Sequence, residues 1–252
     1  MAERSMVESR YDLAVVAPAR DEAGNLTALV EQVAGAFAPT GWRVQVVVVD
    51  DGSRDGTWEE LERLRGRFAD LVTRRHARGR GQSAALATGI AAARATLVAT
   101  LDADLQNDPA DLPRMVELLR AQGADLVQGD RTAGRQDAWP RRVASGVGRV
   151  ARRVVIGDRV RDTGCATRVM RAEVAGALPL DRPGMHRFIP ALVAGGGGVV
   201  VETAVGHRRR TVGRTKYGTG LIRRGLPGLR DCFVVRAALR QAARSAGRAV
   251  PA

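Results

Sequence analysis

The sequence contains few of the residues that mark several common protein classes. Its 252 residues include 2 cysteines, Cys165 and Cys232, which lack the close spacing of zinc ligands. Because a cytosolic disulfide would be unusual, we expect two free thiols. Aromatic residues make up only 4% of the chain, which argues against a nucleic-acid-binding module. No apolar run reaches about 18 residues, so no transmembrane helix is predicted.

Histidine and lysine are also scarce. The 3 histidines, His76, His186 and His207, have no ligand spacing, and we expect structural or surface roles for them. Lys216 is the only lysine among the 40 basic residues. Its use in a chain so rich in arginine indicates either a position that prefers a compact ammonium or chance.

The N-terminal segment, residues 1–10, is polar and lacks the apolar core of a secretory signal. The sequence therefore predicts a protein that stays in the cytosol. A hydrophobic content of 45% and a charged content of 27% are typical of a soluble globular protein. The length fits one large domain with a tail.

Positive charge is concentrated at the C-terminal end. The whole chain has a net charge of +13, and residues 207–252 carry nearly all of it, with 12 basic residues against the single acid Asp231. Such a block usually meets anionic lipid or nucleic acid. Residues 221–248 mix apolar and arginine side chains, and Pro227 divides them. This segment is predicted either to lie in the headgroup layer of a membrane or to pack its apolar face on the body.

Strand-like and helix-like segments alternate along the first half of the chain. The predicted strands are residues 13–18, 44–49, 71–75, 96–101 and 125–128, and the predicted helices are residues 22–37, 57–68, 82–93 and 109–121, with Pro109 as the first residue of its helix. This alternation predicts an α/β fold whose central sheet is mainly parallel and carries helices on both faces. Beyond Gly129 the pattern weakens to a helix over 170–178 and a strand over 199–205.

Polar clusters follow three of the predicted strands, at residues 20–22, 50–51 and 102–104. Ligands of open parallel sheets bind beyond the carboxyl ends of the strands, so these clusters are expected to meet. Asp102 and Asp104, two residues apart after a buried strand, can reach one oxygen-preferring cation such as magnesium or manganese. A solvated turn would also explain a D-x-D tripeptide taken alone.

A competing motif is Gly79-Arg80-Gly81-Gln82-Ser83-Ala84, which matches the G-x-G-x-x-A dinucleotide fingerprint. It suggests an NAD(P)-dependent oxidoreductase. However, it follows the third predicted strand rather than the first, and it leaves Asp50, Asp51 and Asp104 unexplained.

Taken together, the motifs resemble family-2 glycosyltransferases, and most closely the dolichyl-phosphate or polyprenyl-phosphate mannosyl- and glucosyltransferases. The resemblance covers roughly residues 11–220. The motifs that carry it are Pro18-Ala19-Arg20-Asp21-Glu22, Asp50-Asp51-Gly52-Ser53, Gly81-Gln82-Ser83, Asp102-Ala103-Asp104-Leu105-Gln106, Gly129-Asp130-Arg131, Asp162-Thr163-Gly164-Cys165 and Thr215-Lys216-Tyr217-Gly218.

The resemblance implies a GT-A fold, the Rossmann-like fold of nucleotide-diphospho-sugar transferases, and assigns roles to particular positions. Nucleotide contacts fall to Pro18, Ala19, Glu22, Asp50, Asp51 and Gly81. The resemblance assigns metal and diphosphate binding to Asp102, Asp104 and Gln106. It assigns binding of the phosphate of a lipid acceptor to Arg131, Arg141, Arg142 and Ser145. Lys216 would lie near the donor phosphates, and Asp162 would act as a base or orient the acceptor. Asp21 replaces the usual Asn, and Ala19 stands where an aromatic residue is common, so the nucleotide stays open.

These assignments predict an inverting enzyme that moves a hexose from GDP-mannose or a UDP-hexose to a polyprenyl or dolichyl phosphate. A GT-A domain over 11–218 would lie between an N-terminal extension, 1–10, and a basic extension, 219–252, that meets an anionic membrane surface. The enzyme would then be peripheral at the cytoplasmic face of the plasma membrane. The alternatives are a soluble glycan or small-molecule acceptor and the oxidoreductase. A nucleic-acid partner is not expected, because residues 1–206 are nearly neutral.

Overall fold

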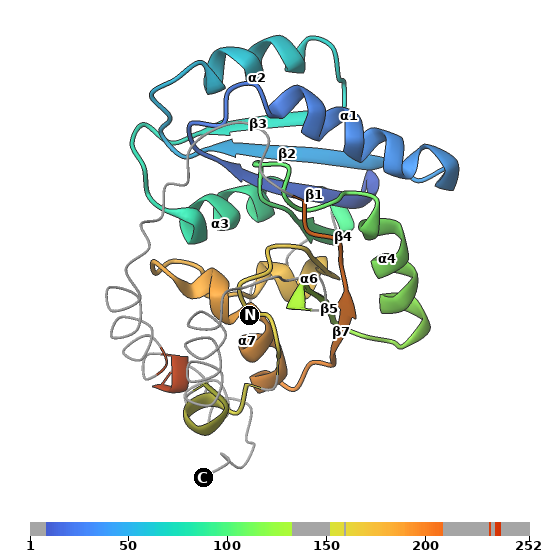
Figure 1. Cartoon of the computed structure of the whole chain (residues 1–252), viewed down its shortest axis with the longest axis vertical. Helices are drawn as coiled ribbons and strands as arrows, with labels where there is room; N and C mark the ends of the chain where they lie inside the picture. Colours follow the sequence, from blue (N-terminus) through green and yellow to red (C-terminus); the bar gives the residue numbers. More distant parts are fainter. Residues whose placement is uncertain (1–8, 133–151, 159, 209–231, 233–234, 238–252) are drawn as a thin grey trace.

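The structure is a computed structural model that describes residues 9–132, 152–158, 160–208, 232 and 235–237. Within these residues the chain forms a seven-stranded sheet in the order β3-β2-β1-β4-β6-β5-β7 (Figure 1). The strands are β1 (Tyr11–Ala19), β2 (Val44–Asp50), β3 (Leu71–Arg75), β4 (Ala95–Thr100), β5 (Leu126–Asp130), β6 (Arg168–Arg171) and β7 (Val200–Ala204). All neighbouring strands are parallel except β6, which runs antiparallel to both β4 and β5. The predicted α/β fold with a mainly parallel sheet is confirmed.

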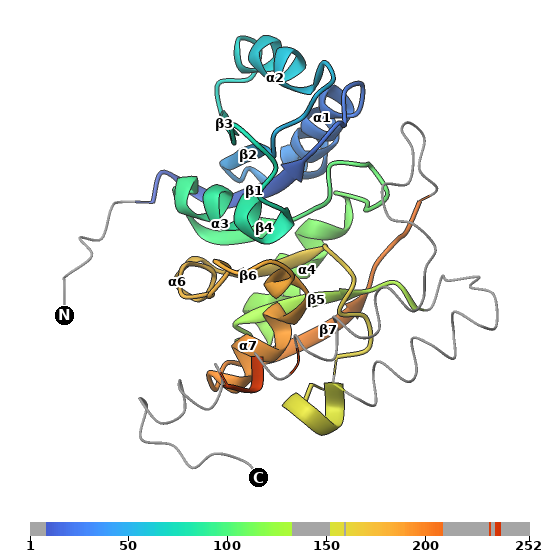
Figure 2. The ribbon, with the colours of Figure 1, turned by 90° about the vertical axis from the view of Figure 1, so that its left-hand side faces the viewer.

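Helices cover both faces of the sheet (Figure 2). One face carries α1 (Leu26–Phe37), α2 (Thr57–Arg65) and α4 (Asp111–Ala121), and the other carries α3 (Gln82–Ala92), α6 (Ala172–Gly176) and α7 (Ile189–Gly195). Two short 3-10 turns, η1 (Ala38–Thr40) and η3 (Met185–Phe188), precede β2 and α7. Each face has its own hydrophobic core.

The central strands are apolar along nearly their whole length because both of their faces are covered. In β2, the sequence VQVVVVD is buried from its second residue onward. Val48 packs in the core under α1 and α2, whereas its neighbour Val47 packs in the core under α3, as the two-residue period of a strand requires. A run of β-branched residues thus places β2 in the interior of the sheet.

Several predicted boundaries differ from the structure, three of them at the start of a helix. Residues 170–178 were expected to be one helix, but Met170 belongs to β6 and α6 begins only at Ala172. The helix expected to begin at Pro109 begins at Asp111, as α4. The helix expected from Glu22 begins at Leu26, because Asp21 and Gly24 have φ of +47° and +87° and form a turn before it.

The C-terminal extension contributes two buried side chains to the body. Cys232 and Val235 are 3% and 0% exposed and belong to the same hydrophobic core as Met170 and Ile189. For these residues, packing on the body is the alternative that the structure supports. Cys165 and Cys232 are both free thiols, as predicted. In the described ranges, no helix has the length and apolar character needed to cross a bilayer.

Gly89 of α3 sits where the helix approaches β1 most closely. A Cβ built there would come within 2.3 Å of Val16 Cγ1, inside the core. We expect Gly89→Ala to lower the free energy of unfolding by about 1–3 kcal/mol, the usual effect of overpacking a core. The matched control is Gly35→Ala, at an exposed position of α1 where nothing lies within 4 Å of an added Cβ. This variant should leave the free energy of unfolding unchanged or raise it by about 0.4–1 kcal/mol. Urea unfolding of both variants measures the difference, and equal effects would contradict this account of the α3–β1 contact.

Candidate active site

The polar clusters meet at the carboxyl edge of the sheet. In the register of the parallel strands, Ala19 lies beside Asp50, and Asp50 lies beside Arg75. Thr100, the last residue of β4, lies beside Val16 of β1 and leads into Asp102. The chain fills the sheet on one side of β1 with β2 and β3 and then crosses to β4, so the strand order reverses between β1 and β4. Ligands of open α/β sheets bind at such a crossing.

Asp51 holds the loop that connects β3 to α3. Its Oδ1 accepts hydrogen bonds from the backbone N–H of Arg80 at 2.8 Å, and its Oδ2 accepts from that of Gly81 at 2.8 Å. The ring Nδ1 of His76 lies 2.7 Å from the same Oδ1, while His76 Nε2 lies 2.9 Å from Thr88 Oγ1. The expected structural role of His76 is therefore confirmed. Asp51 shapes the loop on which the predicted nucleotide contact Gly81 lies.

The next residue in the chain connects this loop to the D-x-D motif. Gln82 donates from Nε2 to Asp102 Oδ1 at 2.8 Å, directly after Gly81, whose N–H binds Asp51. Asp51 and Asp102, which are 51 positions apart in the sequence, thus contact adjacent residues at the start of α3. The expected proximity of Asp51 and Asp102 at the carboxyl edge is confirmed.

Asp102 and Asp104 form a close carboxylate pair. Burial, together with the negative charge of Asp104, raises the pKa of Asp102 from 3.8 to about 6, although Arg131 and Arg168 oppose the shift. Within the described ranges no group of three His, Cys, Asp or Glu side chains converges as in an all-protein metal site. Two close carboxylates that repel each other nevertheless suit a cation that takes its other ligands from water and phosphate. The donor set fits magnesium or manganese.

The D-x-D loop is pinned by the segment that leads to the basic tail. Asn107 pairs with His207 in an antiparallel bridge, and Arg208 N donates to Gln106 O at 2.8 Å. The Arg208 guanidinium binds Asp108 and donates to Gln32 Oε1. Gln106 itself donates from Nε2 to Arg208 O at 3.4 Å. Residues 207 and 208, which precede the basic tail, are therefore held against the loop that follows the carboxylate pair.

The backbone conformation of the loop after β1 accounts for the aspartate at position 21. Asp21 has φ of +47°, a left-handed conformation that Asn and Asp tolerate better than most residues. Its Oδ1 accepts from Arg54 N, and its own N–H donates to Ser53 Oγ. Aspartate in place of the expected asparagine thus satisfies the same turn. Glu22 is buried and accepts from Asn25 Nδ2 at 2.9 Å.

Arg131, directly after β5, is held by Asp162. Its Nε and Nη2 donate to the two carboxylate oxygens at 2.8 and 3.1 Å, a bidentate pair. Burial lowers the pKa of Arg131, but the hydrogen bond and charge of Asp162 outweigh burial and raise it overall. A carboxylate bound on both oxygens is poorly placed to take a proton, so Asp162 orients Arg131. Of the two roles expected for Asp162, a base or orientation of the acceptor, the geometry disfavours the base, and it shows Asp162 orienting Arg131.

His186 of η3 contacts the first turn of α3 through Ser83. The backbone N–H of His186 donates to Ser83 Oγ at 3.2 Å, and the ring Nδ1 lies 2.9 Å from the same oxygen. Burial, reinforced by the charges of Arg168 and Arg187, lowers the pKa of His186 to about 3. The imidazole is therefore neutral at physiological pH and fastens η3 to the helix that carries Gln82.

Four predicted residues, Arg141, Arg142, Ser145 and Lys216, lie outside the described residues. Sequence reasoning also missed three side chains that the structure brings to the site: Gln82, Gln128 and Arg168. Gln82 was visible inside the motif Gly81-Gln82-Ser83. The signal for Arg168 was a charged residue at the start of the apolar stretch Val169-Met170, where a buried strand requires that the charge find partners.

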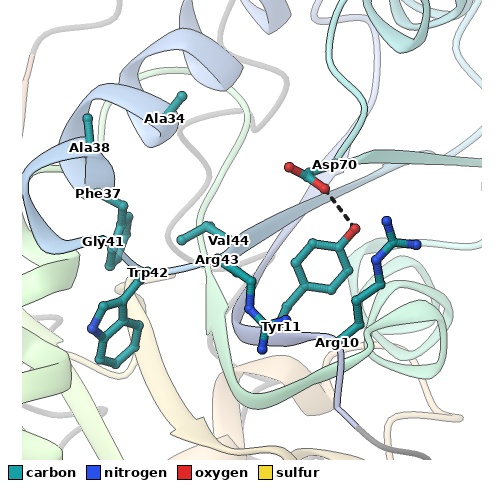
Figure 3. A pocket seen from close by; sticks show the side chains of 10 residues that line it. All are labelled: Arg10, Tyr11, Ala34, Phe37, Ala38, Gly41, Trp42, Arg43, Val44 and Asp70. Carbon is teal, nitrogen blue, oxygen red and sulfur yellow. Dashed lines mark hydrogen bonds between the residues drawn. The ribbon is translucent and has the colours of Figure 1, made fainter.

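Two hollows lie away from this site. One, of about 620 Å³, is at the amino ends of β1 and β2, opposite the carboxyl edge; Figure 3 shows Tyr11 Oη donating to Asp70, with Arg10 beside the Tyr11 ring. The other, of about 480 Å³, lies between the ends of β5 and β7 and contains Asp130 and Glu202. Neither hollow includes Asp102 or Arg131.

The geometry also disfavours a dinucleotide site at residues 79–84. Such a site needs open backbone amides for a pyrophosphate. Here the N–H groups of Arg80 and Gly81 already bind the carboxylate of Asp51, and a Cβ at Gly79 would lie 2.5 Å from the guanidinium of Arg20. The turn is filled by the protein's own side chains.

Comparisons with known proteins agree with this site. Residues 14–178 match the family described as Glycosyl transferase family 2. A dodecaprenyl-phosphate galacturonate synthase of Rhizobium johnstonii is 37% identical over 211 residues, which cover 82% of this chain and 62% of that protein. An undecaprenyl-phosphate 4-deoxy-4-formamido-L-arabinose transferase of Aeromonas hydrophila is 36% identical over 82% of this chain and 63% of its own length. The chain thus spans less than two thirds of these relatives.

Solved structures support the fold. Glucosyl-3-phosphoglycerate synthase of Mycobacterium tuberculosis, in complex with phosphoglyceric acid, aligns with a TM-score of 0.64 at 20% identity over 89% of this chain and 81% of that chain. The same enzyme with Mn²⁺, UDP and glucosyl-3-phosphoglycerate aligns with a TM-score of 0.61 at 21% identity over the same shares. At this identity the likeness concerns the fold alone, and it confirms the expected GT-A architecture. The family match over residues 14–178 goes further than the fold: the chain belongs to glycosyl transferase family 2.

Proposed function

We propose that this protein transfers a sugar from a nucleoside-diphosphate sugar to a polyprenyl phosphate. The observation that carries the proposal is the arrangement of charges at the carboxyl edge, where a carboxylate pair, Asp102 and Asp104, lies near the partly buried Arg131 and the buried Arg168. The carboxylates suit the cation of a donor diphosphate, and the guanidinium of Arg131 suits a second phosphate. Relatives named as polyprenyl-phosphate sugar transferases support the acceptor.

The state of Asp162 favours a phosphate acceptor over a hydroxyl acceptor. A sugar hydroxyl needs a general base to remove its proton. A phosphate monoester is already largely ionised at neutral pH, since its second pKa is about 6. Asp162 is bound to Arg131 through both carboxylate oxygens, so it serves orientation better than proton removal. An ionised phosphate oxygen positioned by Arg131 needs no base.

In the proposed mechanism the protein positions two anionic substrates beside each other. Asp102 and Asp104, with Gln106 as a further candidate ligand, would hold a magnesium or manganese ion, which stabilises the charge of the departing diphosphate when bound. Magnesium and manganese are both found with UDP in the solved relative, and the present donor set does not separate them. Arg131 would hold the acceptor phosphate in line with the anomeric carbon, so that a single displacement inverts its configuration. Asp51 would set the nucleotide-side loop through Arg80 and Gly81.

We further propose a cytoplasmic, membrane-peripheral location in which the basic extension meets anionic lipid. Residues 219–252 carry seven arginines against one acid, and each basic group near an anionic leaflet contributes about 1 kcal/mol of attraction. Arg208, the last described residue before the basic extension, binds Asp108 close to the D-x-D motif, so a membrane that met residues near it would lie close to the site. The buried Cys232 and Val235 limit this role to other parts of the extension.

The experiment that tests the function measures nucleoside-diphosphate release by the purified chain. A panel of UDP- and GDP-sugars is offered with Mn²⁺ or Mg²⁺ and with polyprenyl phosphate, polyprenol or a soluble glycan as acceptor. We expect release only with the lipid phosphate, complete loss after chelation, and a faster reaction in anionic than in zwitterionic vesicles. Equal release with polyprenol or the glycan would contradict the phosphate acceptor, and metal-independent release would contradict the cation.

A further inference from the structure

A buried polar pair lies behind Arg131 and Asp162. Gln128 and Arg168 are 0% and 2% exposed, and they face each other in the register between β5 and β6. Arg168 Nε donates to Gln128 Oε1 at 2.7 Å, and its Nη2 donates to Thr163 O at 3.3 Å. Burial lowers the pKa of Arg168, which shows that the site holds the charge at a cost in free energy. A core that needed only packing would be served as well by an apolar pair.

The amide of Gln128 gathers the loop that contains Asp162. Its Nε2 lies 3.2 Å from Asp162 O, 3.1 Å from Cys165 O and 3.0 Å from Gly129 O, all of which accept from it. Together with the bond from Arg168 to Thr163 O, the pair binds carbonyl groups of three of the four residues in the segment 162–165. Two side chains therefore specify the backbone path of this loop.

The path of the loop decides where Arg131 can point. Asp162 is the first residue of the loop, and its carboxylate holds the Nε and Nη2 atoms of Arg131. On the other side there is no space for adjustment, because a Cβ at Gly129 would lie 3.0 Å from both Cys165 Sγ and Thr167 O. A shift of the loop would be passed directly to the Arg131 guanidinium.

We propose that Gln128 and Arg168 are positioning residues for the transfer reaction, which fix the 162–165 loop so that Asp162 aims Arg131 at the acceptor phosphate. This inference rests on the proposed function for the identity of the acceptor. Neither residue is required to touch a substrate. A misplacement of about 1 Å in such a constellation can cost about a hundredfold in rate.

The test uses Arg168→Lys, which keeps the positive charge but loses the planar fork that reaches Gln128 and Thr163 together. We expect kcat for polyprenyl phosphate to fall about 10- to 100-fold, while the KM for the donor changes less than about threefold. The matched control is Val169→Ala, the next residue of β6, which is fully buried and makes no polar contact with the loop. It should lower Tm and leave kcat unchanged.

A double-mutant cycle with Asp162→Asn shows whether the effect passes through the loop. If Arg168 acts through Asp162, the double variant should lose little more activity than Asp162→Asn alone. Multiplicative losses, or an Arg168→Lys kcat equal to that of Val169→Ala, would overturn the proposal.

An activity-free measurement separates this proposal from the proposed function. The Arg131 Nε–H, which donates to Asp162, should exchange its proton slowly in arginine-labelled nitrogen NMR spectra. Arg168→Lys should speed this exchange at least about tenfold, whereas Val169→Ala should not. If the wild-type chain used a soluble acceptor instead of the lipid, the proposed function would fail, yet faster exchange would still support positioning. Unchanged exchange would overturn the positioning role whatever the acceptor.

Discussion

Replacing Asp104 by Asn is expected to abolish the gain in donor affinity that Mn²⁺ or Mg²⁺ provides and to lower kcat/KM about a hundred- to a thousandfold. The amide keeps the size of the side chain. Its oxygen can still accept the hydrogen bond that Gln106 N–H donates to Asp104 Oδ1 at 3.2 Å. The loop should therefore keep its shape, and only the negative charge beside Asp102 is removed. Calorimetric titration of the nucleotide sugar with and without the metal measures the affinity.

The same substitution should not lower the thermal stability of the metal-free protein. Asp104 is the main charge that raises the pKa of Asp102, after burial, so its neutralisation relieves repulsion in the metal-free site. We expect Asp104→Asn to be neutral or slightly stabilising in thermal unfolding while it destroys metal binding. The matched control is Asp12→Asn at the opposite end of β1, an exposed carboxylate that should change neither quantity. Full metal-dependent binding by Asp104→Asn would refute the assignment of the cation site.

The sequence predicts the convergence of the acidic clusters for a simple reason. Strands with continuous β-branched runs, such as β2, must be buried on both faces, and the crossover helices between them force parallel pairing. Their carboxyl ends then share one edge, which places Asp50 and Asp102 in the same region wherever the loops go. The motif resemblance added the GT-A fold, and both expectations depend on local pattern alone.

The structure adds what depends on side-chain partners across long separations. Sequence reasoning could not anticipate that Asp51 binds the amides of Arg80 and Gly81, because a carboxylate after a strand looks the same whether it faces a ligand or a loop. It also missed the four-residue strand β6, since the arginine at its first position interrupts the apolar pattern that predicts a buried strand. That strand is antiparallel, which is why Arg168, its first residue, lies beside Thr100 at the end of β4. Reversal of one strand brings a buried charge to the active edge.

Substitutions of Arg131 are expected to separate effects on stability from effects on catalysis most clearly. Arg131→Met is expected to lower the free energy of unfolding by about 3–5 kcal/mol, because it leaves the buried Asp162 carboxylate without its bidentate partner. Adding Asp162→Leu removes the uncompensated charge, so the double variant should recover most of that loss. Transfer to polyprenyl phosphate should nevertheless stay at least about a hundredfold below wild type in both variants, since neither can bind the acceptor phosphate. Denaturant unfolding and steady-state kinetics measure the two quantities.

Arg131→Lys completes the comparison, because it keeps a charge near Asp162 but cannot bind both carboxylate oxygens and a phosphate at once. It should cost less stability than Arg131→Met and still lose about 10- to 100-fold in kcat/KM for the acceptor, with the KM for the donor nearly unchanged. If the double variant regained activity together with stability, Arg131 and Asp162 would be a structural pair only. In that case the acceptor phosphate would have to be bound by arginines elsewhere in the chain. If stability and activity separate as expected, an apolar pair stabilises the fold as well as the ion pair does. The ion pair then serves to bind the acceptor phosphate.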